Sequence, residues 1–407
     1  MALLLGKGER LSDWREVDDF TASYQAAAIK LSAAKRPEAA ATVLAAIQAD
    51  LGVLSAENRQ FIEQTRQVGE RLAKAATQEQ LRNVLADFYT EAYRHFRRFA
   101  SVPAFFEAAN GFLVSLTSLQ VDILRNESPN RLPPVALVVL GPAGRLEYTR
   151  FCRVQLALVW EGTGKAAEQR VMEDFSEQLV AWLRSCGVAL DEAVTPVHPE
   201  WRGTLTQWRE RLQDGIARND SAELIELLRL VDQAVLVDDQ GLAGRFRALC
   251  SEQLHRRPAV VNLIERSITL SNGLGMMGGF RLARNGPYRG TFSLLNHALV
   301  PLAACIGALC LCHDIVEDGT PRRLRELVRH DRLSIDLAER ALQAWQLFSH
   351  YRLTLELSAS VGQDCRDILN LDPGKLDPQE QEQLRAGLEA VFELQRHLQV
   401  SFGQLQG

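Results

Sequence analysis

The spacing of apolar residues divides the chain into helical ends and a short strand-rich middle. Over residues 1–130, apolar positions recur every three or four residues, as in LRNVLADFYTEAYRHF (81–96), which predicts amphipathic helices. Thr77 followed by Gln80 predicts a capping box that opens one of these helices. Pro103 predicts the first turn of the next helix, where the missing N–H of proline costs nothing.

The middle of the chain has a different pattern. The proline-containing segment RNESPNRLPP (125–134) predicts a linker. Two apolar runs rich in β-branched residues follow it, VALVVL (135–140) and VQLALVW (154–160), and both predict strands. An amphipathic helix is expected over 164–185, and GVAL (187–190) is a candidate third strand. The alternation of strands and a helix indicates a small α/β domain.

Beyond about residue 201 the pattern is helical again. Asp220 with Glu223, and Asp377 with Glu380, predict capping boxes at two helix starts. The fold class expected is α+β, mostly helical, with a small mixed sheet between two helical regions.

Composition excludes several classes of function. The net charge of −5 gives no basic field that would recruit nucleic acid, so we expect no nucleic-acid partner. The longest apolar stretch, Ala298–Cys312, contains a proline and is shorter than the roughly 20 residues of a membrane span. The short apolar run MALLL at the N-terminus does not make a signal peptide. The seven cysteines are odd in number and lie mostly among apolar residues, which favours reduced thiols in a cytoplasmic protein.

Candidate chemistry lies between the two predicted strands. Gly141 and Gly144 form a glycine turn after the first strand, and such a turn lets the backbone approach a ligand closely. A helix is expected to follow, and its first N–H groups would favour a phosphate in the turn. Arg145 would add a charge-assisted contact to an anion, and Glu147 would lie one turn into that helix.

The segment GPAGRLE (141–147), followed by a strand that contains ALV, resembles the nucleotidyltransferase domain related to the uridylyltransferase of PII signal proteins. HPEWRGTLTQW (198–208) is similar to a tryptophan- and arginine-containing segment of that family. RLRELVRHDRLS (323–334), LFSHYRL (347–353) and the last helical segment (371–402) resemble the helical substrate-binding domain that follows in the family. The resemblance implies three parts: an N-terminal helical region (1–130), a nucleotidyltransferase-like α/β domain (131–215) and a C-terminal helical substrate-binding domain (216–407).

The chain departs from this family at the residues that carry the chemistry. A serine that helps to hold the triphosphate is replaced by Pro142. The family's Thr-Asp-x-Asp on the second strand is replaced by Cys152, Arg153, Val154 and Gln155, and its two aspartates bind magnesium. Magnesium requires carboxylate or other hard oxygen ligands, so a guanidinium and an amide at these positions predict a degenerate metal site. We therefore expect no cofactor.

Two alternatives would give this site a function despite the lost aspartates. Asp191 and Glu192, together with Glu147, would form a shifted carboxylate set, in which case the protein would be an active nucleotidyltransferase that uses magnesium. In the other, Arg153 would replace the metal and bind an anion directly.

Two cysteine motifs have simpler interpretations. A Cys310-x-Cys312 pair on a helix points in two directions, which argues against zinc and favours structural cysteines. Cys152 beside Arg153 has no base near it in the sequence, so it is interpreted as a small strand residue rather than a nucleophile.

The sequence thus predicts a degenerate, regulatory member of a nucleotidyltransferase family that binds a nucleotide or a protein partner in signalling. An active transferase that adds a uridylyl or adenylyl group to a protein is the first alternative. A structural adaptor, whose old pocket is filled by side chains, is the second.

Overall fold

The structure is a computed structural model that describes residues 56–65, 67–68, 70–72, 74–75, 77–128, 131–218, 220, 224, 226–275, 278–360 and 362–406. The expected helices within residues 1–55 and the capping box of Asp220 with Glu223 lie outside the described residues. Contacts divide the chain into two compact units, Met1–Phe112 and Leu113–Gly407, which are described separately below.

The first unit contains helix α4 (Gln78–Phe99) and the start of helix α5 (Val102–Glu127). The predicted capping box is present, because the Thr77 side chain accepts from the Gln80 backbone and the Gln80 side chain accepts from the Thr77 backbone. Aromatic rings form the core of this unit. Phe88 and Phe112, for example, stack with their ring centroids 4.4 Å apart.

The second unit is built around a four-stranded mixed sheet. Its strands are β1 (Val135–Leu140), β2 (Gln155–Trp160), β3 (Arg202–Thr204) and β4 (Gln233–Asp238), in the order β3-β2-β1-β4. β1 pairs antiparallel with both β2 and β4, and β2 pairs parallel with β3. Every residue of β1 is buried, as its unbroken apolar run predicts for a central strand.

The sequence prediction was correct for β1 and β2 and wrong for the rest of the sheet. GVAL contributes only an isolated bridge between Val154 and Leu190. β3 lies instead within 198–208, and β4 lies in a segment that we expected to be helical. The α+β fold class with mostly helical flanks is confirmed.

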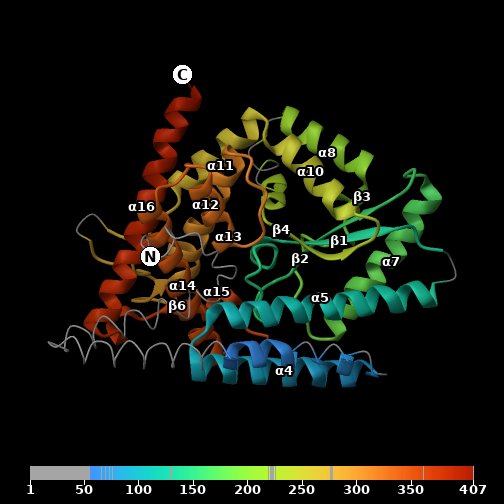
Figure 1. The fold of residues 1–407 in the computed structure, drawn as a ribbon, viewed down its shortest axis with the longest axis horizontal. Coiled ribbons are helices and arrows are strands. Elements are labelled where there is room, and N and C mark those ends of the chain that lie inside the picture. Colours follow the sequence, from blue (N-terminus) through green and yellow to red (C-terminus); the bar gives the residue numbers. More distant parts are fainter. Residues whose placement is uncertain are drawn as a thin grey trace. The chain divides into compact units, whose positions relative to one another are not determined.

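Helices cover the sheet and form the C-terminal half of the second unit. The short helix α6 (Gly141–Gly144) follows β1, and α10 (Leu242–Leu254) contacts the three longer strands and packs against α8 (Leu205–Arg218), as Figure 1 shows. The remaining helices and short turns near the sheet are α7 (Ala166–Ser185), η1 (Pro199–Trp201) and η2 (Leu228–Val231).

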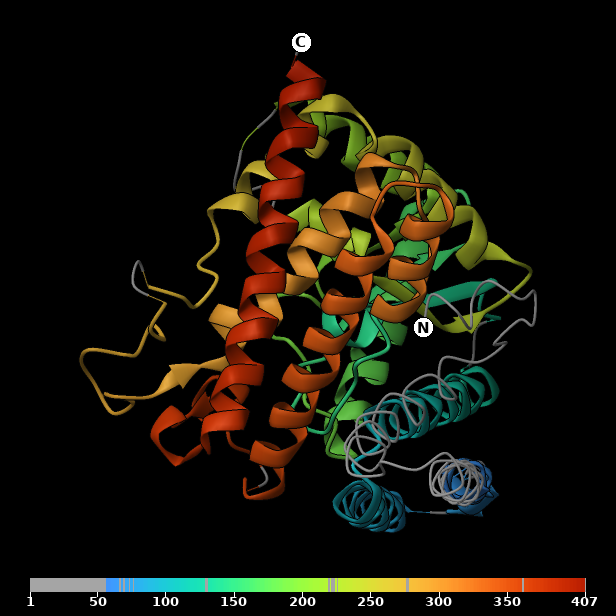
Figure 2. The same cartoon turned by 60° about the vertical axis from the view of Figure 1, so that its left-hand side comes forward.

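The C-terminal helices pack along α16 (Pro378–Gln406), the long red helix of Figure 2. Its partners are α11 (Arg257–Thr269), α12 (Val300–Cys312) and α14 (Ile335–Leu357), and α13 (Thr320–Arg329) packs on α12 and α14. The smaller elements are β5 (Phe292–Ser293), η3 (Leu295–Leu299), α15 (Cys365–Ile368), β6 (Asn370–Leu371) and η4 (Pro373–Lys375), and β5 pairs with β6. The predicted capping box of Asp377 with Glu380 is present at the start of α16.

Among the described helices, two are long and apolar enough to cross a membrane by length and composition alone, Val102–Glu127 and Leu295–Cys312. Of the most apolar window of each, 56% is buried within the structure, a property that core helices of globular proteins share. They are therefore weak evidence for a membrane span.

Candidate functional site

The glycine turn is tight and closely packed. Gly141 has φ of 64°, in the left-handed region that glycine adopts without strain. A β-carbon at Gly144 would lie 2.2 Å from the carbonyl oxygen of Asp232, so a side chain cannot fit there. The N–H of Gly141 donates to the same Asp232 carbonyl at 3.1 Å. The start of β4 therefore closes directly over the turn.

The helix expected after this turn is only one turn long. α6 ends at Gly144, and Leu146 takes a positive φ of 62°, which turns the chain away from a helical path. Glu147 consequently lies in an irregular segment rather than on a helix, and the expectation of a longer helix was wrong. The side chains after the turn instead reach the helices of the C-terminal half.

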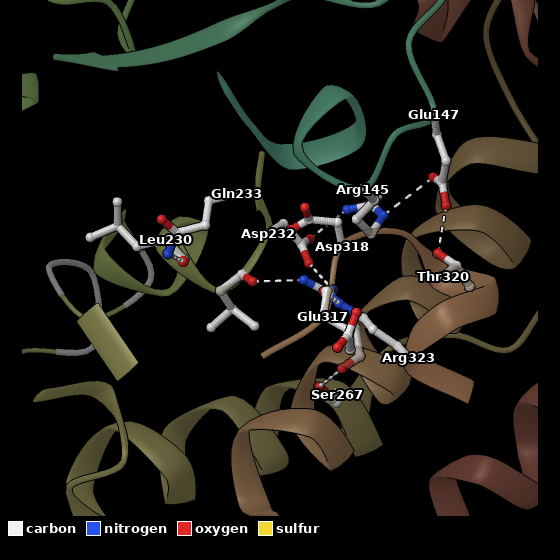
Figure 3. A network of polar contacts seen from close by, with 12 residues as sticks. Arg145, Glu147, Leu230, Asp232, Gln233, Ser267, Glu317, Asp318, Thr320 and Arg323 are labelled. Carbon is white, nitrogen blue, oxygen red and sulfur yellow. Dashed lines mark hydrogen bonds and ion pairs between the residues drawn. The ribbon is translucent and has the colours of Figure 1, made fainter. Parts of the chain in front are cut away.

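Arg145 is held by two carboxylates. Its side chain is 12% exposed, its Nη1 donates to Asp232 at 2.5 Å, and its Nε donates to Glu147 at 3.2 Å (Figure 3). Asp232 also accepts a hydrogen bond from Arg323 of α13. Burial opposes the charge of Arg145, but the two carboxylates raise its pKa above the ordinary value. Burial likewise opposes the charge of Asp232, and the two guanidinium groups lower its pKa.

Glu147 is also fully engaged. Its Oε1 accepts from the Thr320 hydroxyl at 2.6 Å and from the Trp345 indole N–H at 2.8 Å. Its other oxygen accepts from Arg145, and its side chain is only 7% exposed. This carboxylate therefore links the segment after the turn to α13, through the Thr320 contact seen in Figure 3, and to α14 through Trp345.

A second buried pair continues this linkage. Arg352 of α14 pairs with Glu356 at 3.0 Å, and both side chains are almost completely buried. Arg352 also donates to the backbone carbonyl of Glu147 at 3.2 Å and to the hydroxyl of Thr149 at 2.8 Å. Burial opposes the charge of Arg352, but Glu356 raises its pKa above the ordinary value. Hydrogen bonds from α14 thus hold the segment between β1 and β2 in place.

The position of the second expected aspartate is filled by Gln155. A β-carbon on Gly141 would lie 3.0 Å from its Oε1, so the amide sits against the glycine turn. Its Nε2 donates to Asp191 Oδ2 at 3.1 Å. Asp191 Oδ1 accepts from the backbone N–H groups of Ala193 and Val194. The side chains of Gln155 and Asp191 are therefore hydrogen-bonded to each other, and Asp191 is also hydrogen-bonded to the backbone.

Arg153, at the position of the first expected aspartate, points to the C-terminal half. Its Nη2 lies 2.8 Å from Asp364, and its side chain is 48% exposed. Asp364 also accepts from Arg366, and the hydrogen bonds from Arg366, followed by the charge of Arg153, keep its pKa below the ordinary value. Half of the Arg153 side chain thus remains open to solvent.

The residues at these positions do not fit a magnesium ion. Arg153 brings a positive charge, and the Gln155 amide presents its N–H to Asp191. Glu192, a member of the shifted carboxylate set, is 77% exposed and pairs with Arg184 at 3.2 Å. Within the described residues, no three His, Cys, Asp or Glu side chains gather closely enough to hold a metal ion.

Pro142 lies in the first turn of α6, where its missing N–H breaks no helix bond. It supplies neither the hydroxyl nor the N–H that a serine would offer a phosphate. Cys152 lies in a bend before β2 and not in a strand, so the expected strand position was wrong. The residue is buried, and burial raises the pKa of its thiol.

The tertiary structure adds residues that the sequence did not single out. Asp232, Arg323, Arg352 and Glu356 complete the contacts of the turn, although Asp232 lies 87 positions beyond Arg145. A weak signal was available for Asp232, since it immediately precedes the apolar run QAVLVD that becomes β4.

Comparison with known families agrees with this arrangement. A family model described as a putative nucleotidyltransferase matches residues 62–222, which contain the glycine turn, Arg153 and Gln155. A second, described as a putative nucleotidyltransferase substrate binding domain, matches residues 257–402, which contain α13 and α14. Among curated proteins, none matches the chain. Since the two matches follow each other in the family's order, the chain belongs to this family of putative nucleotidyltransferases, with their substrate-binding domain in its C-terminal half.

Proposed function

We propose that this chain is a catalytically degenerate nucleotidyltransferase that acts in the cytoplasm, in signalling, by binding a nucleotide or a protein partner. The observation that carries the proposal is the hydrogen bond from the Gln155 amide to Asp191, directly against Gly141. It puts an N–H donor where the family has a metal-binding carboxylate.

The loss of both carboxylates removes the main electrostatic support for transfer. Nucleotidyl transfer develops charge on the phosphate oxygens, and bound metal ions neutralise that charge. Arg153 would repel such an ion, the Gln155 amide oxygen is a poor replacement for a carboxylate, and Glu147 is held by Arg145 and Thr320. These contacts argue against the active alternative with a shifted carboxylate set.

Arg153 supports binding without a metal. Its guanidinium is half exposed and shares Asp364 with Arg366, so a phosphate group can compete for its remaining N–H donors. Nucleotide binding through Arg153 would then be indifferent to magnesium.

The test is calorimetric titration with ATP, UTP and cyclic dinucleotides, each with and without magnesium. We expect binding that does not change with magnesium and that weakens by about tenfold or more in Arg153→Ala. Arg184→Ala is the matched control, because Arg184 has a similar exposure and also pairs with one carboxylate. Nucleotide binding that requires magnesium, or transfer of a labelled nucleotidyl group, would refute the proposal.

The structural adaptor is the second candidate, and one observation favours it. Arg145 and Glu147 were expected to contact a ligand at the turn. Both instead form ion pairs or hydrogen bonds with other side chains of the protein. An adaptor would bind none of the nucleotides in the titration above, and it would still bind a protein partner.

A further inference from the structure

A cavity lies at the end of the sheet opposite to the glycine turn. The turn follows Leu140, which pairs with Gln155 at the start of β2, whereas Trp160 at the other end of β2 pairs with Val135. The cavity has a volume of about 350 Å³, within the range of small-molecule sites. Its lining includes Trp160, Gln169, Arg170, Arg202, Gln207 and Arg211.

The cavity occupies a favourable place in the topology. β2 and β3 run parallel, and the cavity is lined by Trp160 at the end of β2, by Arg202 of the three-residue β3 and by Gln207 shortly after it. α7 begins at Ala166 and α8 at Leu205, and first-turn residues of both helices, Ala166 and Gln207, line the cavity. Ligands of α/β sheets bind beyond the carboxyl ends of parallel strands, where helix N-termini favour negative charge.

The charged side chains of the lining also favour an anion. Arg170, Arg202 and Arg211 face one acidic residue, Glu173, which pairs with Arg202 at 2.7 Å. Arg211 donates to backbone carbonyls, among them that of Glu200 at 2.7 Å. Arg170 is exposed, and no hydrogen bond or ion pair joins it to another described residue. Its guanidinium is therefore available to a ligand.

The wall of the cavity also contains a buried tryptophan. Trp160 is 2% exposed and lines the cavity, yet its indole N–H has no hydrogen-bond partner among the described residues. A small anion in the cavity would lie against this side chain, so the indole signal of Trp160 would report its binding.

The loop before α7 packs closely against the first turn of α8 beside this cavity. Gly164 has φ of 70°, and a β-carbon there would lie 3.1 Å from the Nε2 of Gln207. The N–H groups of Thr163 and Gly164 both donate to Glu168 Oε2, which holds the loop against the first turn of α7.

We propose that this cavity binds a small organic anion through a phosphate or carboxylate group. The anion contacts the guanidinium of Arg170, packs against the side chain of Trp160 and lies at the N-terminal ends of α7 and α8. The site is separate from the glycine turn and does not depend on the function proposed above.

The test follows the indole signals of protein labelled with ¹⁵N-tryptophan while pyrophosphate or citrate is added. Trp160→Phe assigns the signal of Trp160 among the six tryptophans. We expect a saturable shift of that signal with at least one of the two anions. In Arg170→Ala the apparent affinity falls by about tenfold or more, since a charge-assisted contact is lost.

Two control variants define the site. Arg209→Ala removes an exposed arginine of the same helix α8 that does not line the cavity, and Arg153→Ala removes the cation near the glycine turn. Both should keep the wild-type shift. A response to pyrophosphate alone identifies a phosphate ligand, and a response to citrate alone identifies a carboxylate ligand. The proposal is wrong if neither anion shifts the Trp160 signal, or if Arg170→Ala binds like the wild type.

Discussion

At Gly144 the chain and β4 approach so closely that only a hydrogen atom fits between them. A β-carbon would lie 2.2 Å from the Asp232 carbonyl oxygen and 2.9 Å from that of Val139, and both are backbone atoms that cannot rotate away. We expect Gly144→Ala to lower the free energy of unfolding by roughly 3 kcal/mol or more, because the backbone at Asp232 must move away from the turn. Urea unfolding of the purified protein measures the change.

Gly244 in α10 provides the matched control, because a β-carbon there would meet nothing within 4 Å. Gly244→Ala should leave stability unchanged or raise it by about 0.5–1 kcal/mol, since alanine favours the helix. Equal effects of the two substitutions would contradict the packing argument.

His95 of α4 is buried beside neutral partners in the first unit. Its Nε2 lies 2.8 Å from the Asn58 side-chain oxygen, and its ring stacks on Phe61 with centroids 4.1 Å apart. Burial, with a smaller contribution from Arg98, lowers the pKa of His95 from 6.5 to about 4. The folded state thus holds this imidazole neutral over a range in which the unfolded chain protonates it.

This pKa shift predicts a loss of stability in weak acid. Between pH 6.5 and about 4 the unfolded state binds the additional proton, so stability falls as the pH drops through that window, by on the order of 3 kcal/mol at most. Above this window the contribution is fully present. Thermal unfolding at about pH 7 and about pH 4.5 should show a smaller acid-induced fall in Tm for His95→Gln than for the wild type. An identical fall in both would show that His95 does not titrate in this way.

At the scale of elements, helix α14 carries two arginines in opposite environments. Arg352 and Glu356 are 7% and 0% exposed, and Arg352 also holds Thr149. Arg340 and Glu393 form an ion pair at 2.5 Å, but they are 39% and 44% exposed. Breaking a buried pair leaves an unpaired charge without water, whereas an exposed partner is simply rehydrated.

We therefore expect Arg352→Ala to cost about 3–5 kcal/mol of unfolding free energy and Arg340→Ala less than about 1 kcal/mol. Chemical denaturation of the two variants in the same buffer gives the comparison. A small loss for Arg352→Ala would mean that Glu356 is protonated or reaches water in the variant, and that the clamp on the turn is weak.

Strand β4 shows why element prediction was incomplete. The run QAVLVD (233–238) has the β-branched residues of a strand, but it lies between helical segments and has no turn residues at its N-terminal side. Its pairing with β1 decides its conformation, and β1 precedes it by about a hundred residues. Such long-range pairing leaves no periodic signal in a single sequence.

On the scale of the whole molecule, burial controls the chemistry of the thiols. All seven cysteines are free, and five are buried, Cys152, Cys186, Cys250, Cys305 and Cys310. Burial raises the pKa of Cys305 and of Cys310 to about 12 and that of the half-buried Cys312 to about 11. Thiolate, the reactive form, is therefore scarce at these three cysteines in the native protein.

A thiol titration with an aromatic disulfide reagent at about pH 7 tests this directly. We expect no thiol to react rapidly in the native protein and all seven to react in denaturant. A single fast-reacting native thiol, assigned by its Cys→Ser variant, would identify an activated cysteine and contradict the structural role given to Cys152.

The sequence by itself determined the α+β class, β1 and β2, the capping boxes that open α4 and α16, and the family. These features are local: periodicity, caps and short motifs are properties of neighbouring residues. Only the tertiary structure decided the partners of the glycine turn. Arg145 could be assigned to an anion from sequence, but Asp232 and Glu147 occupy it in the fold, and Arg323 and Arg352 arrive from helices far along the chain. Buried charges must be paired, and which charges meet depends on packing that no local pattern records.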